Sequence, residues 1–133
     1  FSLGEIELKI ERARLDWATI TITAMDGADL RSPGRILLVA TGDVKNTGAR
    51  IEDLGQGRIT LGSRWGSEPI LCEGIGAGIA LPVDAARVRL YALDEAGNRR
   101  VAIPVADRGG RALLAIGPQY KTVWYEIEIV RQP

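Results

Sequence analysis

The sequence predicts an all-β protein, an antiparallel β-sandwich of the Ig-like or jelly-roll-like kind with about eight or nine strands. Three observations lead to this fold class. Apolar and polar residues alternate with a period of two, turn-forming pairs separate these runs at intervals of about 8–15 residues, and no window joins a helix cap to an apolar stripe of helical spacing. These patterns do not give the order of the strands.

The alternation defines the individual strands. The runs 5–15 (EIELKIERARL) and 17–25 (WATITITAM) alternate strictly over 5–11 and 18–24, which is typical of a strand with one buried face. Residues 35–42 (RILLVATG) are continuously apolar, so we expect a strand covered on both faces. Three later runs alternate less strictly: 88–93 (VRLYAL), 99–105 (RRVAIPV) and 123–130 (VWYEIEIV).

Turn chemistry separates the runs. Glycine supplies the positive φ that tight turns require, and it occurs here in four turn-forming pairs: Asp26-Gly27, Pro33-Gly34, Gly97-Asn98 and Gly109-Gly110. Residues 91–105 (YALDEAGNRRVAIPV) therefore predict one hairpin with a short loop over Glu95 to Asn98.

Composition excludes several classes of function. The 133 residues fit a single domain, 1–133, which we expect to be a segment of a longer protein. Seventeen basic residues balance seventeen acidic ones, so neither nucleic acid nor an anionic membrane surface is an expected partner. The chain has no His and one Cys, which removes the commonest general base, a disulfide and a cysteine-based zinc site.

Residues 42–69 contain one short strand candidate, 58–61, and otherwise predict a long irregular region that could carry a binding surface. It leads into the stretch SRWGSEPILCEGIGAG, 63–78, with the carboxylates Glu68 and Glu73. In an extended segment these carboxylates would lie roughly 15 Å apart, too far for a glycosidase pair. We therefore expect no catalytic residue in this chain and assign Glu73 to anchoring loop amides or an Arg.

A carbohydrate-binding module would need exposed aromatic residues, because a ring face packs against the CH groups of a pyranose. The candidate residues for carbohydrate binding are Trp65, Trp124, Arg64, Glu68, Asn46, Tyr120 and Gln119. Alternation predicts that Tyr125 is buried and that Trp124 is exposed beside Glu126 and Glu128.

For several residues a simple packing role competes with the binding role. The alternative for Trp65 is that it folds back over the end of the sandwich or forms an interface, in which case Trp65→Ala would lower the melting temperature by several degrees. Trp17 is expected in the core or at a sheet edge, and Cys72 as a buried, inert thiol. A structural calcium ion is the one cofactor considered, with turn chemistry as the alternative role of its four candidate ligands: Asp26, Asp29, Asp94 and Glu95.

Four segments in this order carry a resemblance to a known family: MDGADLRSPGRILLVATGDVKNTGAR, WGSEPILCEGIGAGIALP, RVRLYALDEAGNRRVAIPV and LLAIGPQYKTVWYEI. Together they resemble the β-sandwich domain that follows the catalytic barrel of some bacterial glycoside hydrolases, from about Trp17 to Ile127. The chain departs from that pattern at Ala49, Arg50 and Ile51, where the family has an aromatic residue.

The resemblance implies a non-catalytic accessory domain of a secreted or periplasmic polysaccharide-degrading enzyme. Such a domain packs on the catalytic barrel of the same chain and borders its cleft, with a possible contact to oligo- or polysaccharide. Two alternatives stay open: an autonomous carbohydrate-binding module that targets a polysaccharide, and an Ig-like structural or adhesive domain without a sugar role.

Overall fold

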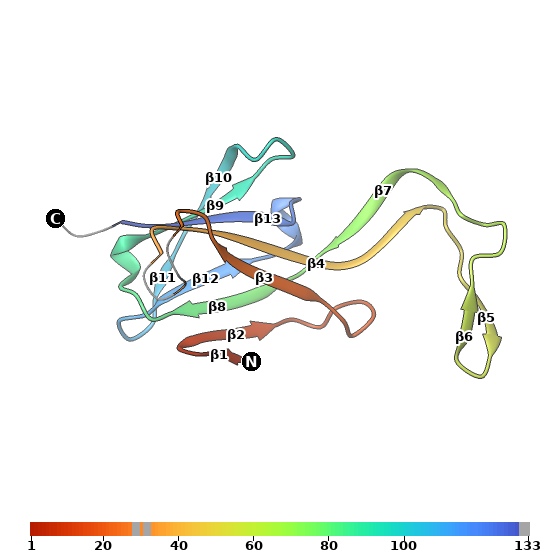
Figure 1. Ribbon diagram of the computed structural model, residues 1–133, viewed down its shortest axis with the longest axis horizontal. Helices are drawn as coiled ribbons and strands as arrows, with labels where there is room; N and C mark the ends of the chain where they lie inside the picture. Colours follow the sequence, from red (N-terminus) through yellow and green to blue (C-terminus); the bar gives the residue numbers. More distant parts are fainter. Residues whose placement is uncertain (28–29, 31–32, 131–133) are drawn as a thin grey trace.

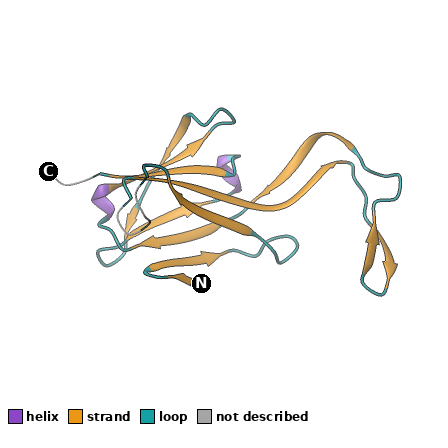
Figure 2. Cartoon of the chain, viewed as in Figure 1, coloured by secondary structure: helices purple, strands orange, loops and turns teal. Residues whose placement is uncertain are grey.

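In a computed structural model, which describes residues 1–27, 30 and 33–130, the chain folds into a two-layer β-sandwich from which a long two-stranded arm projects (Figure 1). Strands and their connections account for nearly all of the described chain, with two short 3₁₀ turns (Figure 2). The all-β prediction is confirmed. No helix in the described part of the chain is long and apolar enough to cross a membrane.

Thirteen strands occur within the described residues, more than the eight or nine expected. In chain order they are β1 (Ser2–Leu3), β2 (Ile6–Ile10), β3 (Thr19–Ala24), β4 (Arg35–Thr47), β5 (Glu52–Gly55), β6 (Arg58–Thr60), β7 (Ser67–Gly74), β8 (Ala77–Leu81), β9 (Val88–Leu93), β10 (Arg99–Ile103), β11 (Ala106–Asp107), β12 (Ala112–Ile116) and β13 (Trp124–Ile129). The 3₁₀ turns are η1 (Ala85–Arg87) and η2 (Pro118–Tyr120).

All strand pairs are antiparallel and form two main sheets. The first sheet has the order β1-β2-β8-β12-β11, and the second has the order β10-β9-β13-β4-β3, with β7 added beside the outer half of β4. The chain passes from the second sheet to the first where β7 leads into β8. Strands β5 and β6 form a separate small hairpin at the end of the arm (Figure 1).

The hydrophobic core lies between the two main sheets. Its most buried members come from the central strands of both layers: Ile36, Leu38, Ile79, Leu90, Leu114, Tyr125 and Ile127, each at most 2% exposed. These residues sit at alternate positions of their strands, as the period-two patterns predict. Burying side chains of this size contributes about 1.5–3 kcal/mol each, so this cluster provides the main stabilisation of the fold.

The predicted faces are largely confirmed. In β3 the odd-numbered threonines are exposed and the even-numbered apolar residues are half-buried, and in β13 Tyr125 is buried while Trp124 is 38% exposed. The prediction that β4 is covered on both faces is wrong, because Leu37 and Val39 on its outer face are half-buried rather than buried. Trp17 is also not a core residue; it precedes β3 in a loop and is 58% exposed.

Two turns follow the predicted chemistry closely. Strands β9 and β10 form the expected hairpin, and the Asp94 carboxylate accepts hydrogen bonds from the backbone amides of Ala96 (3.0 Å) and Asn98 (2.8 Å). These bonds, chiefly the one from Asn98, lower the pKa of Asp94. Gly109 and Gly110, between β11 and β12, both have positive φ, as a tight turn at this position requires.

The expected irregular region at 42–69 is instead a β-structured arm. Strand β4 continues beyond the sandwich as far as Thr47, and β7 runs back beside it from Ser67. Register shifts interrupt the pairing between Thr41 and Val44 and again after Asn46. We refer to residues 42–73 as the arm and to the other described residues as the body.

Candidate functional site

The arm is fixed to the body by a carboxylate. Glu73, near the end of β7, accepts hydrogen bonds from the backbone amides of Arg14 (2.7 Å) and Asp43 (3.1 Å). One carboxylate thus joins the loop between β2 and β3 to the point where β4 leaves the sandwich. The predicted anchoring role of Glu73 is confirmed.

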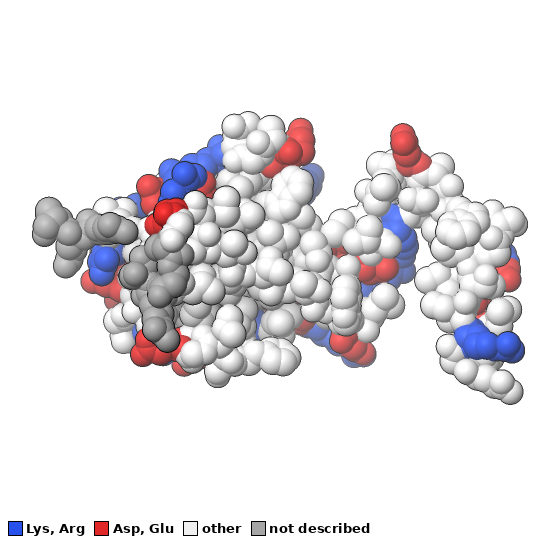
Figure 3. All heavy atoms as spheres, viewed as in Figure 1, with Lys and Arg blue, Asp and Glu red and all other residues white. Residues whose placement is uncertain are grey.

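The arm carries an unusual number of exposed apolar side chains. The arm is described in full, and seven of its large apolar residues are 47–66% exposed: Val44, Ile51, Leu54, Ile59, Trp65, Ile70 and Leu71. In the space-filling view the outer part of the arm stands apart from the body, and its surface is mostly uncharged (Figure 3). An apolar surface of this extent on a soluble domain commonly marks a site of interaction.

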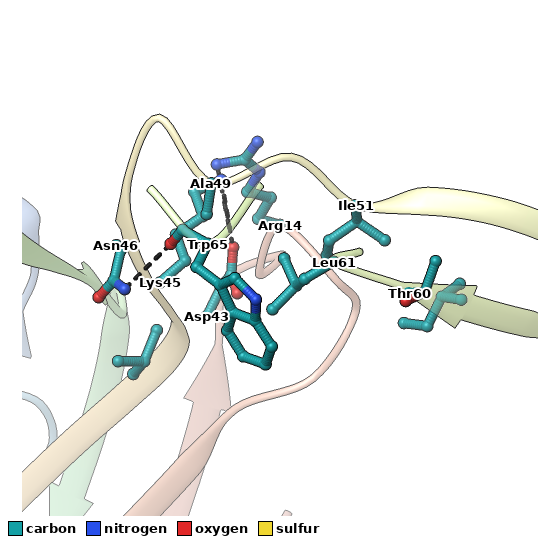
Figure 4. Close-up of a pocket in the computed structure, with 11 residues that line it drawn as sticks. Arg14, Asp43, Lys45, Asn46, Ala49, Ile51, Thr60, Leu61 and Trp65 are labelled. Carbon is teal, nitrogen blue, oxygen red and sulfur yellow. Dashed lines mark hydrogen bonds and ion pairs between the residues drawn. The ribbon is translucent and has the colours of Figure 1, made fainter. Parts of the chain in front are cut away.

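Part of this apolar surface lines a hollow of about 600 Å³ at the bend of the arm. Figure 4 shows Trp65 near its centre, with the apolar side chains Ile51 and Leu61 beside it and Thr60 of β6 farther along the arm. Polar groups from Arg14, Asp43, Lys45 and Asn46 complete the wall. The hollow therefore joins an exposed indole to several hydrogen-bonding groups.

The backbone around Trp65 is held by local contacts. The Asn46 side-chain amide donates a hydrogen bond to the Trp65 carbonyl (3.0 Å), and the Arg50 backbone amide donates to the Arg64 carbonyl (3.1 Å). Gly66 has a φ of 73°, and a Cβ there would collide with the Thr47 carbonyl and the Ala49 amide. The segment that carries Trp65 can approach 47–49 because this residue is glycine.

The charges at the hollow are paired. Asp43, with a side chain 18% exposed, lies 3.5 Å from the Lys45 ammonium and 3.9 Å from the Arg14 guanidinium. Arg64, the neighbour of Trp65, forms an ion pair with Glu52 of β5. The two cations are balanced by two carboxylates, because Glu73 also lies here and binds the backbone amides of Arg14 and Asp43.

The structure corrects one interpretation of Trp65 and leaves two others open. Trp65 is 61% exposed on the arm, so it does not fold back over the end of the sandwich. With so little of the indole buried, the expected loss of several degrees in the melting temperature of Trp65→Ala no longer follows. Interface residue and sugar platform both stay possible roles, because each needs a ring that is accessible in the isolated domain.

The other candidate sugar-binding residues fall into two groups. Asn46 and Arg64 lie with Trp65 on the arm, and Glu68 is exposed in β7. Gln119, Tyr120 and Trp124 lie on the body, in η2 and at the start of β13. The Tyr120 ring is half-buried and packs edge-on against Tyr125, with 6.3 Å between ring centroids.

The pairing of Glu126 was not predicted. We expected it on an exposed face, but it is 6% exposed, because Arg35 and Arg99 cover it and donate hydrogen bonds of 3.1 and 2.5 Å to its Oε1. The Arg99 guanidinium also stacks 4.1 Å from the centroid of the Tyr91 ring. The hydrogen bond from Arg99 is the main reason that the pKa of Glu126 is lowered.

Two further predictions concern reactive or metal-binding groups. Cys72 is exposed rather than buried, because it lies on the part of β7 that has left the sandwich. Among the described residues no group of three or more His, Cys, Asp or Glu side chains is placed to hold a metal ion. The calcium candidates Asp26 and Asp94 accept backbone hydrogen bonds within turns, and Asp29 lies outside the described residues.

Comparison of the chain with protein-family models, with curated proteins and with solved structures gives no match. The resemblance to the accessory domains of glycoside hydrolases therefore stays a prediction from the sequence.

Proposed function

We propose that this chain is a non-catalytic accessory domain of a secreted or periplasmic carbohydrate-active enzyme, and that it packs on the catalytic domain of the same chain through its arm. The observation that supports this most directly is the set of seven exposed apolar side chains on the arm. The arm projects away from the core, so these side chains cannot be buried against the body (Figure 1). The link to carbohydrate rests on the sequence resemblance.

Hydrogen exchange in the full-length enzyme tests the docking. We expect the backbone amides of 50–60 to exchange more slowly in the full-length enzyme than in the isolated 133-residue chain, because a partner surface covers them. Ile59→Lys should abolish this added protection by placing a charge in the apolar contact. The control is Val101→Lys, which changes an apolar residue that is 40% exposed on the body. Equal exchange of 50–60 in the two proteins would refute docking by the arm.

A second candidate function is supported by the hollow at Trp65. An exposed indole in a hollow that is also lined by Asn46, Lys45 and Thr60 is suited to stacking on a sugar ring while donating and accepting hydrogen bonds. The chain would then be an autonomous carbohydrate-binding module. The two functions share part of one surface, because Ile51, Ile59 and Trp65 line the hollow and also belong to the exposed apolar set.

Affinity electrophoresis on a panel of polysaccharides tests the sugar site. We expect Trp65→Ala to abolish retardation by the bound polysaccharide, with little change in melting temperature because the ring is mostly exposed. Trp17→Ala is the matched control, since Trp17 has a similar exposure of 58% but lies in the loop before β3. Retardation that survives Trp65→Ala would rule out the hollow as the sugar site. Lack of retardation together with unprotected arm amides would favour the structural or adhesive alternative.

The proposal includes the absence of hydrolysis by the isolated domain. The Glu73 carboxylate is engaged by two backbone amides, and Glu68 lies on the exposed part of β7. A glycosidase needs two carboxyl groups facing each other across a cleft, one of them with a raised pKa. Activity toward aryl glycosides that is lost in Glu68→Gln or Glu73→Gln would contradict this part of the proposal.

A further inference from the structure

The four edge strands of the sandwich differ in how well they are protected from pairing with another chain. Edges expose unpaired amides and carbonyls, and proteins usually shorten them or place charges on them. Strands β1 and β11 have two residues each, and β10 carries Arg99 and Arg100. Strand β3 has six residues, and 18–25 around it contain no charge, no proline and no glycine. It is the least protected of these four edges.

The backbone groups of β3 that have no partner among the described residues can be assigned from the register. The Met25 amide donates to the Arg35 carbonyl (2.8 Å), and β3 and β4 keep one uninterrupted register from there to the pair Thr19 and Thr41. Hydrogen-bonded and non-hydrogen-bonded pairs alternate along such a ladder. The amides and carbonyls of Thr19, Thr21 and Thr23 therefore face β4, whereas those of Ile20 and Ile22 face outward.

The side chains around this edge are also incompletely covered. Ile20 and Ile22 pack against the core but are only half-buried. Nearby, Phe1 and Trp17 line a shared shallow hollow and are 88% and 58% exposed. The β3 side of the body thus combines free backbone hydrogen-bonding groups with exposed apolar side chains.

The sequence of this edge is a palindrome. Residues 18–24 read ATITITA in both directions, with Thr21 at the centre. An isologous interface requires the same segment to be complementary to itself around a two-fold axis. If the axis passes Thr21, every residue faces one of its own type: Thr21 faces Thr21, and Ile20 faces Ile22 of the second copy. A shift by one residue would place Ile opposite Thr, so the core-facing isoleucines of one copy would share a face with the outward-facing threonines of the other.

We propose that β3 is a homodimer interface, at which two copies of this chain pair β3 with β3 in antiparallel fashion around a two-fold axis at Thr21. The outward amides and carbonyls of Ile20 and Ile22 form the hydrogen bonds between the copies. The second sheet of each body then continues into that of the other copy, with isoleucines on the core face and threonines on the outer face. The palindromic sequence favours a second copy of this chain as the partner of β3. Because 18–25 carry no charge, pairing two copies of this segment brings no like charges together.

The mass of the 133-residue chain in solution tests this pairing, measured by light scattering after size exclusion over a concentration series. We expect the wild type to reach twice the monomer mass of 14.4 kDa. Thr21→Lys and Thr21→Glu should each stay monomeric, because like charges face each other at the axis. An equimolar mixture of the two should regain the doubled mass. Val101→Lys, on the opposite edge strand β10, should dimerise like the wild type. Melting curves check that each variant is folded.

A monomeric wild type at every concentration would refute the proposal, as would a dimer that persists in Thr21→Lys. A mixture of the Lys and Glu variants that stays monomeric would refute the register and with it the proposal. Cross-linking gives an independent measurement: with Cys72→Ser as background, Thr21→Cys should form a disulfide-linked dimer on oxidation. Thr23→Cys in the same background should not, because Thr23 faces Thr19 of the second copy. Equal cross-linking of both would contradict the two-fold axis at Thr21.

Discussion

Strand β4 runs through both the body and the arm, but its side chains are buried in the body and exposed in the arm. In the inner half of β4, Ile36, Leu38 and Ala40 are at most 2% exposed, whereas in its outer half Val44 is 57% exposed. The antiparallel pairing continues through both halves, first with β3 and β13 and then with β7. Backbone pairing alone therefore extends the strand, and a second layer is needed to bury its side chains. The body is stabilised by its own core, while the apolar residues of the arm remain available to a partner.

The largest expected difference between the two regions is in stability, when an isoleucine is replaced by alanine in each. Ile79 in β8 is 0% exposed and Ile59 in β6 is 66% exposed. We expect Ile79→Ala to lower the free energy of unfolding by about 2–5 kcal/mol, and Ile59→Ala to change it by less than about 0.5 kcal/mol. Urea denaturation of both variants measures this contrast. Similar losses would show that the arm is part of the cooperative fold rather than a surface for a partner.

A smaller effect is expected from the buried carboxylate of the body. Glu126→Gln should lower the free energy of unfolding by about 1.5–3 kcal/mol at neutral pH, because the charge-assisted hydrogen bonds from Arg35 and Arg99 are weakened. The control is Glu68→Gln, on the exposed part of the arm, which should have little effect.

The effect of Glu126→Gln should depend on pH. The pKa of Glu126 is lowered in the folded state from an ordinary value of 4.5. The carboxylate therefore stabilises the fold fully above pH 4.5, and this contribution is lost as the pH falls through the lowered folded-state pKa. In urea titrations at decreasing pH, the difference in free energy of unfolding between wild type and Glu126→Gln should become smaller below pH 4.5. A gap that stays constant or widens on acidification would contradict the pairing.

The smallest expected effect concerns the junction of body and arm. Glu73→Ala removes the acceptor of the Arg14 and Asp43 amides and should cost about 1 kcal/mol in the free energy of unfolding. Its clearer result should be local: amide exchange should accelerate at 43–47 and 67–72, while the core of β4 keeps its protection. Exchange that accelerates throughout β4 would mean that Glu73 stabilises the body and not the junction.

The sequence predicted the body much better than the arm. Alternation identified β2, β3, β9 and β13 and the burial of Tyr125. In those strands one face packs on the core, so apolar residues occur at every second position. The arm has no core-facing side, so 42–69 shows no such alternation and resembles a loop. The pairing of β4 with β7 depends on register shifts that local sequence does not encode.

The candidate site was predicted in part, for similar reasons. The anchoring role of Glu73 was assigned after its spacing from Glu68 excluded a catalytic pair, and the exposure of Trp124 followed from alternation. The burial of Glu126 could not be deduced in this way, since Arg35 and Arg99 reach it from strands on either side. The exposure of Trp65 and Cys72 likewise depends on the projection of the arm, which is a tertiary property.

The pairing of Thr41 with Gly74 has a consequence for how this domain can change. Residues opposite each other in an antiparallel ladder have Cα atoms about 4.5–5.5 Å apart, so the chain leaves the body and returns to it at nearly the same point. A tight hairpin turn bridges such a gap. A segment of different length or surface can therefore replace 42–73 without shifting the register of any other strand in the body.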